Sequence, residues 1–264
     1  KNAAVEVDGS AYWMSENGFF RYTGKLDSLA CLVEDYVYDD MNTVPKQHIY
    51  AGLNNLFGEV TWFYPGSGAA SNNRSVTYNY MDSTPERPVW TTSTLARSAW
   101  SDSHIFGKPH ATEYDSSATS DTTVGNTDGV TVYYEHETGQ DQIKAGARTG
   151  ISASIESGDF DISATQGGGA DLRGDGEHMM KIRRVLPDFL QQTGDARVTL
   201  NLKNYPTDSQ ASSSLGPFTT TTSTTKIDTR ARARAISLKV DNTSTGQHWK
   251  LGTFRLDIQP DGRR

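Results

Sequence analysis

The sequence is poor in cysteine and in long hydrophobic runs. Its 264 residues include 1 Cys, Cys31, which lies in the apolar segment DSLACLVEDY, so no intrachain disulfide can form and a small buried residue is its expected role. Secreted β proteins of this size are often stapled by disulfides, and a single cysteine therefore favours folding in a reducing cytoplasm. No run reaches the roughly 18 apolar residues of a membrane-spanning helix, and no signal peptide is visible. The sequence predicts no membrane span.

Helical patterns are equally scarce. The best candidate is VLPDFLQQTG, residues 185–194, and its internal proline opposes a helix. Apolar residues make up 35% of the chain, a low value, whereas 12 Tyr, 5 Trp and many Thr, Ser and Gly residues are present. This composition is typical of many short strands joined by turns. The sequence therefore predicts an all-β protein with one large domain or two smaller ones.

The first half repeats a strand–turn–strand pattern. AYWMSENGFFRYTGKL contains two aromatic strands around Asn17-Gly18, a strong hairpin signal. HIYAGLN, EVTWFYP, RSVTYNYM and PVWTTST follow as four short strands, and four antiparallel strands in about 45 residues match one β-propeller blade. The segment from AAVEVDG to LACLV gives another four-strand set, and PHATEYDS with GVTVYYEHE gives part of a third. Because a closed propeller needs about four or more blades, we expect residues 1–145 to form the C-terminal part of a larger propeller. The alternative is that these sheets close in another way.

The composition changes after a polar, turn-rich loop at residues 116–129 and the segment HETGQDQIKAGARTG. Alternating strands then recur in HMMKIRRVLPDF, ARVTLNLKNYP, PFTTTTST, ARAISLKVDN and WKLGTFRLDIQP. Seven or eight short strands in about 115 residues suit a β-sandwich. We therefore place a domain boundary near residue 145 and predict a C-terminal β-sandwich domain over residues 146–264.

The sequence contains no recognisable catalytic, metal-binding or phosphate-binding motif. Zinc-ligand spacing fails, no GxSxG elbow appears, and the glycines of TQGGGADLRGDG are out of register for a phosphate loop. Glu135, His136 and Glu137 are adjacent, but a strand puts His136 on the face opposite the two glutamates. Asp39 and Asp40 are expected to cap an element or to lie in a turn after a strand. The sequence thus predicts no catalytic residue, no metal ligand and no cofactor.

Arginine occupies every second position of RARARAISLKVDN, residues 230–242. A strand has a period of two, so Arg230, Arg232 and Arg234 are expected on one face and the intervening alanines on the other. One interpretation is an exposed face or a sheet edge protected against aggregation. The other is a contact stripe for an acidic partner.

Several segments resemble virion proteins of short-tailed bacteriophages (podoviruses). The similarity is carried by YWMSENGFFRYTGKLDSLACLVEDYVYDDMN, GEVTWFYP, YNYMDSTPERPVWTTSTLARSAW, YYEHETG and the C-terminal SSTTKIDTRARARAISLKVDNTSTGQHWKLGTFRLDIQPDGRR. These segments occur in the same order, from about Ala3 to Arg264. The resemblance is to the tail hub or nozzle family, also described as DNA-stabilisation or stopper proteins. Such proteins are β-propellers without catalytic residues. They form rings below the portal and adaptor, where they retain packaged DNA and form part of the ejection conduit.

The resemblance implies a virion protein made in the host cytoplasm. It implies a ring-shaped homo-oligomer, expected to be a hexamer, that contacts portal or adaptor proteins and tail fibre or needle proteins. Duplex DNA would pass transiently without sequence-specific binding, since a net charge of -7 argues against a tight grip on phosphate. Inter-subunit or adaptor contacts are expected from arginines that can pair with carboxylates: Arg183, Arg184, Arg230, Arg232, Arg234, Arg255, Arg263 and Arg264. The alternative is that Arg230, Arg232 and Arg234 contact DNA phosphates.

Two other functions stay open at this point. A carbohydrate- or receptor-binding protein of the tail tip would use aromatic platforms from Trp13, Trp62, Trp90, Trp100 and Trp249, although packing is the default role of tryptophan in strands. A propeller-fold glycoside hydrolase would need two carboxyl groups about 5 to 9 Å apart. Its candidates are Asp39, Glu59, Glu135 and Glu137, and their sequence spacing singles out no pair.

Overall fold

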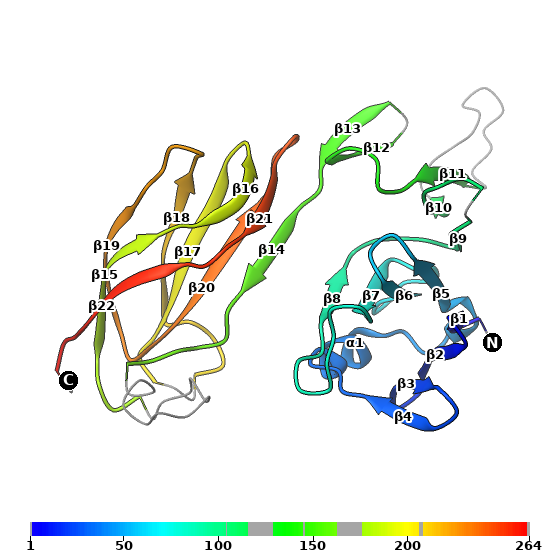
Figure 1. Cartoon of the computed structure of the whole chain (residues 1–264), viewed down its shortest axis with the longest axis horizontal. Coiled ribbons are helices and arrows are strands. Elements are labelled where there is room, and N and C mark those ends of the chain that lie inside the picture. Colours follow the sequence, from blue (N-terminus) through cyan, green and yellow to red (C-terminus); the bar gives the residue numbers. More distant parts are fainter. Residues whose placement is uncertain are drawn as a thin grey trace. The chain divides into compact units, whose positions relative to one another are not determined.

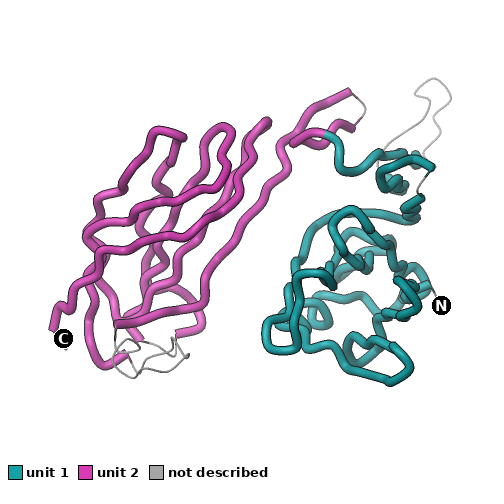
Figure 2. The backbone as a smooth tube through the Cα atoms, in the orientation of Figure 1, with its two compact units in different colours: residues 1–138 teal, residues 139–264 magenta. Residues whose placement is uncertain are grey.

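The computed structural model describes residues 2–103, 105–115, 129–144, 146–162, 176–205 and 208–262. The described part of the chain is nearly all β, with 55% of its residues in strands and 4% in helices, which confirms the predicted fold class. It divides into two compact units, residues 1–138 and 139–264 (Figure 2). Residue 145, where the sequence predicts the boundary, is outside the described residues and falls between two strands that pair with each other.

The N-terminal unit contains two four-stranded antiparallel sheets, each with its strands in chain order (Figure 1). The first consists of β1 (Ala4–Val7), β2 (Ser10–Ser15), β3 (Gly18–Tyr22) and β4 (Leu26–Leu29). The second consists of β5 (Tyr50–Asn54), β6 (Glu59–Tyr64), β7 (Arg74–Asn79) and β8 (Trp90–Ser93). A three-stranded sheet follows, in which β10 (His110–Asp115) lies between β9 (Ala99–Ser101) and β11 (Val130–Glu135). The four-strand sets read from the sequence are present, and the propeller built from them stays a prediction.

The core of the N-terminal unit is aromatic. Phe19 and Trp62 are both 0% exposed, and their ring centroids lie 5.0 Å apart. Trp90 packs on Phe19 at 4.7 Å, and its indole Nε1 donates a hydrogen bond to the carbonyl oxygen of Ala30. The Trp62 indole likewise donates to the carbonyl oxygen of Ala3. Trp62 and Trp90 belong to the second sheet, and both rings pack on Phe19 of the first sheet. Each indole also donates a hydrogen bond to a residue beside the first sheet, so the two tryptophans join the sheets.

The expected turn at Asp39 and Asp40 is wrong, because these residues end a helix, α1 (Glu34–Asp40). Val33, Val37 and Met41 recur every four residues along this segment and pack against the aromatic core, which is the helical period. A single 3-10 turn, η1 (Lys46–His48), follows. No helix in the described residues is long and apolar enough to cross a membrane.

The C-terminal unit contains eleven strands among its described residues. They are β12 (Asp141–Lys144), β13 (Ala147–Gly150), β14 (Ala153–Glu156), β15 (Met180–Leu186), β16 (Phe189–Thr193), β17 (Ala196–Lys203), β18 (Ser213–Thr220), β19 (Ile227–Ala233), β20 (Ala235–Asn242), β21 (His248–Leu251) and β22 (Arg255–Pro260). Segment 185–194, the best helical candidate of the sequence, holds the end of β15 and all of β16 instead.

Four sheets result, with the strand orders β14-β20-β17-β18, β19-β15-β22, β16-β21 and β12-β13. The first two share one hydrophobic core, in which Ile182 of β15 and Leu200 of β17 are both 0% exposed. The sandwich predicted for residues 146–264 stays an interpretation of this arrangement. On the opposite face of the sheet β19-β15-β22, the side chains of Arg183, Asp228 and Arg230 are exposed.

Candidate functional site: a cationic hollow on the C-terminal unit

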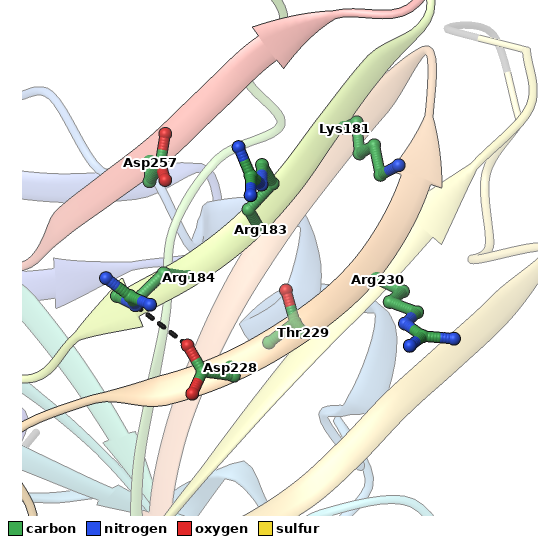
Figure 3. A pocket seen from close by; sticks show the side chains of 7 residues that line it. All are labelled: Lys181, Arg183, Arg184, Asp228, Thr229, Arg230 and Asp257. Atoms are coloured by element: carbon green, nitrogen blue, oxygen red, sulfur yellow. Dashed lines mark hydrogen bonds and ion pairs between the residues drawn. The ribbon is translucent and has the colours of Figure 1, made fainter.

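A hollow of about 560 Å³ lies on the outer face of the sheet β19-β15-β22 (Figure 3). We call it the cationic hollow and define it by its lining residues: Lys181, Arg183, Arg184, Asp228, Thr229, Arg230 and Asp257. Four cations against two carboxylates leave a surplus of two positive charges here, although the whole chain carries a net charge of -7. The hollow therefore concentrates positive charge on an acidic protein.

A β-bulge in β15 places two consecutive arginines in the hollow. Ile182 lies opposite Ile258 of β22, while Arg184 lies opposite Asp257, so Arg183 is one residue in excess of the partner strand. An extra residue resets the inside–outside alternation of a strand. As a result Ile182 and Val185 are both fully buried, whereas Arg183 is exposed and Arg184 is half-buried.

Thr229 stabilises the irregular pairing around this bulge. On the other side of β15, Thr229 and Arg230 of β19 stand opposite the single residue Arg183, because Ile182 pairs with Ala231 and Arg184 with Asp228. The hydroxyl Oγ1 of Thr229 donates a hydrogen bond of 2.6 Å to the carbonyl oxygen of Ile182. This bond satisfies a main-chain acceptor where the ladder is interrupted.

One arginine of the hollow is already paired within the chain. Arg184 Nε donates to Oδ1 of Asp228 at 2.8 Å, and Lys226 lies 3.3 Å from the other oxygen of that carboxylate. The hydrogen bond from Arg184, followed by that from Lys226, lowers the pKa of Asp228 below its ordinary value. Figure 3 shows Arg184 directed at Asp228.

The other three cations are unpaired. In the part of the chain that the structure describes, the side chains of Lys181, Arg183 and Arg230 form neither an ion pair nor a hydrogen bond. They come from two adjacent strands of one sheet, so the backbone holds them in fixed relative positions. Guanidinium groups in such an arrangement bind carboxylates or phosphates through parallel hydrogen bonds.

The predicted arginine stripe is divided rather than continuous. β19 ends at Ala233 and β20 begins at Ala235 in a different sheet, so Arg234 lies at the crossing between sheets. Its Nη1 donates to the carbonyl oxygens of Gly176 and Glu177 at 2.8 and 2.9 Å. The prediction that all three arginines share one strand face is therefore wrong for Arg234, because the chain changes sheets there.

Arg232 is also engaged within the chain, by the carboxylate and the carbonyl oxygen of Asp261. The alanine half of the pattern is confirmed, since Ala231, Ala233 and Ala235 are 1%, 0% and 4% exposed. Small side chains on the inner face let β19 pack closely on the core.

The remaining candidate arginines lie outside the hollow. Arg255 is exposed on β22, opposite Leu186, and does not line the hollow. Arg263 and Arg264 are outside the described residues. Sequence reasoning did not select Asp228 and Asp257, although Asp228 is two residues before Arg230 and so has the period of the same strand face.

The structure brings together two of the four carboxylates proposed for a hydrolase. Asn54 Nδ2 lies 3.0 Å from Oε1 of Glu137 and 3.5 Å from Oε2 of Glu59. Glu135 instead faces Lys108, at 3.6 Å, and Asp39 is in α1. Burial, then the charge of Glu137, raises the pKa of Glu59.

The predicted alternation of Glu135, His136 and Glu137 is wrong beyond Glu135, because β11 ends there and Glu137 has a φ of 56°. His136 instead contacts Arg97. Its Nε2 accepts a hydrogen bond from Arg97. Within the described ranges, no group of three or more His, Cys, Asp or Glu side chains is arranged to hold a metal ion.

No protein-family model matches this chain, and no curated protein matches its sequence.

Proposed function

We propose that this protein is a non-enzymatic structural component of a short-tailed phage tail. In this proposal it is a virion protein and a subunit of a ring-shaped hub or nozzle that retains packaged DNA and forms part of the ejection conduit. The ordered series of similar segments from about Ala3 to Arg264 supports this assignment. The all-β chain with its two four-stranded sheets in sequential order is compatible with it.

One observation carries the molecular part of the proposal: among the described residues, the side chains of Lys181, Arg183 and Arg230 have no partner on their sheet face. Exposed cations that a protein needs only for solubility pair readily with nearby carboxylates or extend separately into water. Here three of them surround one hollow that is built by a bulge. We assign the hollow to the binding of an acidic surface on a neighbouring subunit or on the adaptor protein.

A carboxylate-bearing protein fits the hollow better than duplex DNA does. Asp228 and Asp257 line the same hollow as the cations, where they would repel a phosphate backbone but could accept hydrogen bonds from a partner's own cations. Nonspecific duplex binding needs many clustered Lys and Arg residues. A surplus of two charges on a chain of net charge -7 does not provide such a cluster.

The test is a charge reversal inside and outside the hollow. The double variant R183E/R230E changes two exposed, unpaired side chains and should leave the fold intact. The control K250E reverses an exposed lysine on β21, outside the hollow and outside the set of candidate arginines. Ring formation and capture of the purified adaptor are measured by native mass spectrometry. We expect the double variant to weaken assembly about 100-fold or more, and K250E to assemble as the wild type does.

Two results would contradict the proposal. Unchanged ring and adaptor assembly in R183E/R230E would remove the hollow from the interface. A loss of duplex affinity in this variant, with a smaller salt dependence of DNA binding, would instead assign the cations to phosphate.

A further inference from the structure

The three sheets of the N-terminal unit pack face on face in the order of the chain. Trp62 of β6 packs on Phe19 of the first sheet, with ring centroids 5.0 Å apart. Trp100 of β9 packs on Phe63 of the second sheet, with centroids 5.5 Å apart. Trp62 and Phe63 are neighbours in β6 and so point to opposite faces, which puts the second sheet between the other two. The second and third sheets thus each present a tryptophan to the sheet that precedes them.

Each of these tryptophans is also hydrogen-bonded to the main chain at the first strand of the preceding sheet. Trp62 Nε1 donates to the carbonyl oxygen of Ala3, the residue before β1, at 2.9 Å. Trp100 Nε1 donates to the carbonyl oxygen of Leu53, in β5, at 2.7 Å. The bond satisfies the indole N–H, and the ring supplies the apolar contact. The same combination therefore joins one sheet to the next twice in this unit.

Trp13 occupies the equivalent position in the first sheet. It is the fourth residue of β2, as Trp62 is of β6. It stands opposite Ala4 of β1, just as Trp62 stands opposite Ala51 of β5. Trp62 is 0% exposed, whereas Trp13 is partly exposed, and its indole donates no hydrogen bond within the part of the chain that the structure describes. Trp13 thus has the position of a joining tryptophan without the two contacts that the others make.

Trp13 belongs to an open apolar face of the first sheet. Its ring stacks on Phe20, which stands opposite it on β3, with centroids 5.7 Å apart. Tyr22 and Leu26 stand opposite each other on the same face and are 50% and 58% exposed. We call this surface the Trp13 face and define it by Trp13, Phe20, Tyr22 and Leu26. Contiguous exposed apolar side chains of this kind mark interaction surfaces.

The third sheet has an open face at the other end of the stack. Ala111 lies between Trp100 and Tyr134 across the sheet, and both Ala111 and Tyr134 are buried on the side of the second sheet. Alternation turns the adjacent residues, His110 and Tyr133, to the opposite side. Their rings stack with centroids 5.4 Å apart, and Tyr133 is 63% exposed. We call this surface the Tyr133 face and define it by His110 and Tyr133.

We propose that the Trp13 face binds the Tyr133 face of a second copy of this chain. The two equivalent tryptophans show what covers such a position: an aromatic β-sheet that also supplies a main-chain carbonyl oxygen. The Tyr133 face is the end of the stack that would meet the next tryptophan in the series, so one chain carries both halves of the contact. Because the contact joins two different faces, it is heterologous and repeats from copy to copy until a ring closes.

This contact goes beyond the proposed function and uses a different surface. The cationic hollow lies on the sheet β19-β15-β22 of the C-terminal unit, whereas both faces belong to the N-terminal unit. The contact does not depend on the phage assignment. Sequence reasoning considered Trp13 only as part of an aromatic platform, because its equivalence to Trp62 depends on the register between strands.

Sedimentation velocity of the whole chain over a range of concentrations tests the contact. L26E and Y133E each place a charge on one of the two faces, at side chains that are more than half exposed. The matched control V44E makes the same kind of change at Val44, which is 86% exposed and lies on neither face. We expect the wild type and V44E to self-associate, and L26E and Y133E to associate at least about tenfold more weakly. Circular dichroism checks that each variant is folded.

Mixing the two variants tests whether the contact is heterologous. L26E retains the Tyr133 face and Y133E retains the Trp13 face, so an equimolar mixture should form one-to-one pairs that neither variant forms alone. W13F keeps an aromatic ring but removes the indole donor, and it should weaken self-association about fivefold.

Three results would overturn the contact. A wild type that stays monomeric up to about 1 mM would leave the Trp13 face to a different polypeptide or to a further sheet of a longer chain. Association of L26E and Y133E equal to that of V44E would place the contact elsewhere. A mixture without pairs would mean that the two faces do not bind each other. R183E/R230E alters only the hollow and should keep this contact, so its failure and the failure of the proposed function are measured separately.

Discussion

Arg97 donates a hydrogen bond of 2.9 Å from its Nε to Nε2 of His136. Arg97 is only 4% exposed, and its guanidinium lies 4.0 Å from the centre of the Tyr134 ring. Glu113 approaches the guanidinium at 3.5 Å and accepts a hydrogen bond of 2.8 Å from the Tyr134 hydroxyl. Because Nε2 of His136 is an acceptor here, the imidazole is neutral and carries its proton on Nδ1. The buried arginine is thus held by one carboxylate, one ring face and one neutral histidine.

This arrangement predicts that acid destabilises the N-terminal unit. Burial, then the charges of Arg97 and His110, lowers the pKa of His136 to about 4. The unfolded histidine takes up a proton near pH 6.5, so the unfolded state binds more protons between pH 6.5 and 4. The free energy of unfolding should therefore fall as pH decreases through this window, by at most about 3 kcal/mol. Chemical denaturation followed by tryptophan fluorescence measures it, and an NMR titration of His136 measures its pKa directly.

The control for this prediction is H136Q. A glutamine oxygen can accept the hydrogen bond from Arg97 but does not titrate, so the loss of stability between pH 6.5 and 4 should become smaller. An equal loss in H136Q and in the wild type would assign the acid sensitivity to other groups.

Local periodicity accounts for what the sequence predicted correctly. Alternation predicted that Ala231, Ala233 and Ala235 lie inside, and all three are buried. This inference needs only the two-residue period of a strand. The Asn17-Gly18 hairpin signal also holds, with Ser15 opposite Gly18 across the turn.

The features that could not be predicted from the sequence depend on pairing between distant segments. The bulge at Arg183 depends on the register of β15 against two partner strands, and one strand's sequence does not contain that register. The change of sheets at Arg234 is hidden for the same reason, because the residue pattern continues unbroken through it. The meeting of Glu59 with Glu137 requires the N-terminal unit to be folded.

Removing the Thr229 hydroxyl should destabilise the C-terminal unit. T229V keeps the side-chain shape and β-propensity but deletes the donor to the Ile182 carbonyl, leaving a main-chain acceptor unsatisfied beside the bulge. We expect a loss of about 1 kcal/mol in the free energy of unfolding, measured by denaturant titration. The control T219V alters an exposed threonine of β18 and should change stability by less than about 0.5 kcal/mol. Equal effects of the two substitutions would mean that the bulge does not depend on this bond.

Substitutions on the two faces of β19 should differ in their effect on stability. Ala231 is 1% exposed against the core, so A231L forces extra methylenes into a packed interior and should cost about 1–3 kcal/mol. Arg230, the preceding residue, is exposed and unpaired, and R230A should change stability by less than about 0.5 kcal/mol. Thermal unfolding of the two variants checks the contrast. A strand that tolerated A231L as well as R230A would not have its alanine face in the core.

Cys31 should be an unreactive thiol. Burial raises the pKa of Cys31 to about 11, and the charge of Glu34 adds to the shift. Relative to the ordinary value of 9.0, this lowers the thiolate fraction at pH 8 roughly 100-fold, and the thiolate is the reacting species. Alkylation by iodoacetamide at pH 8 should therefore be about 100-fold slower in the folded chain than in the same chain in urea. Above pH 9 the unfolded thiol ionises before the folded one, so the free energy of unfolding should also fall in that range. Equal alkylation rates in the folded and denatured chain would place Cys31 at an accessible surface rather than beside the aromatic core.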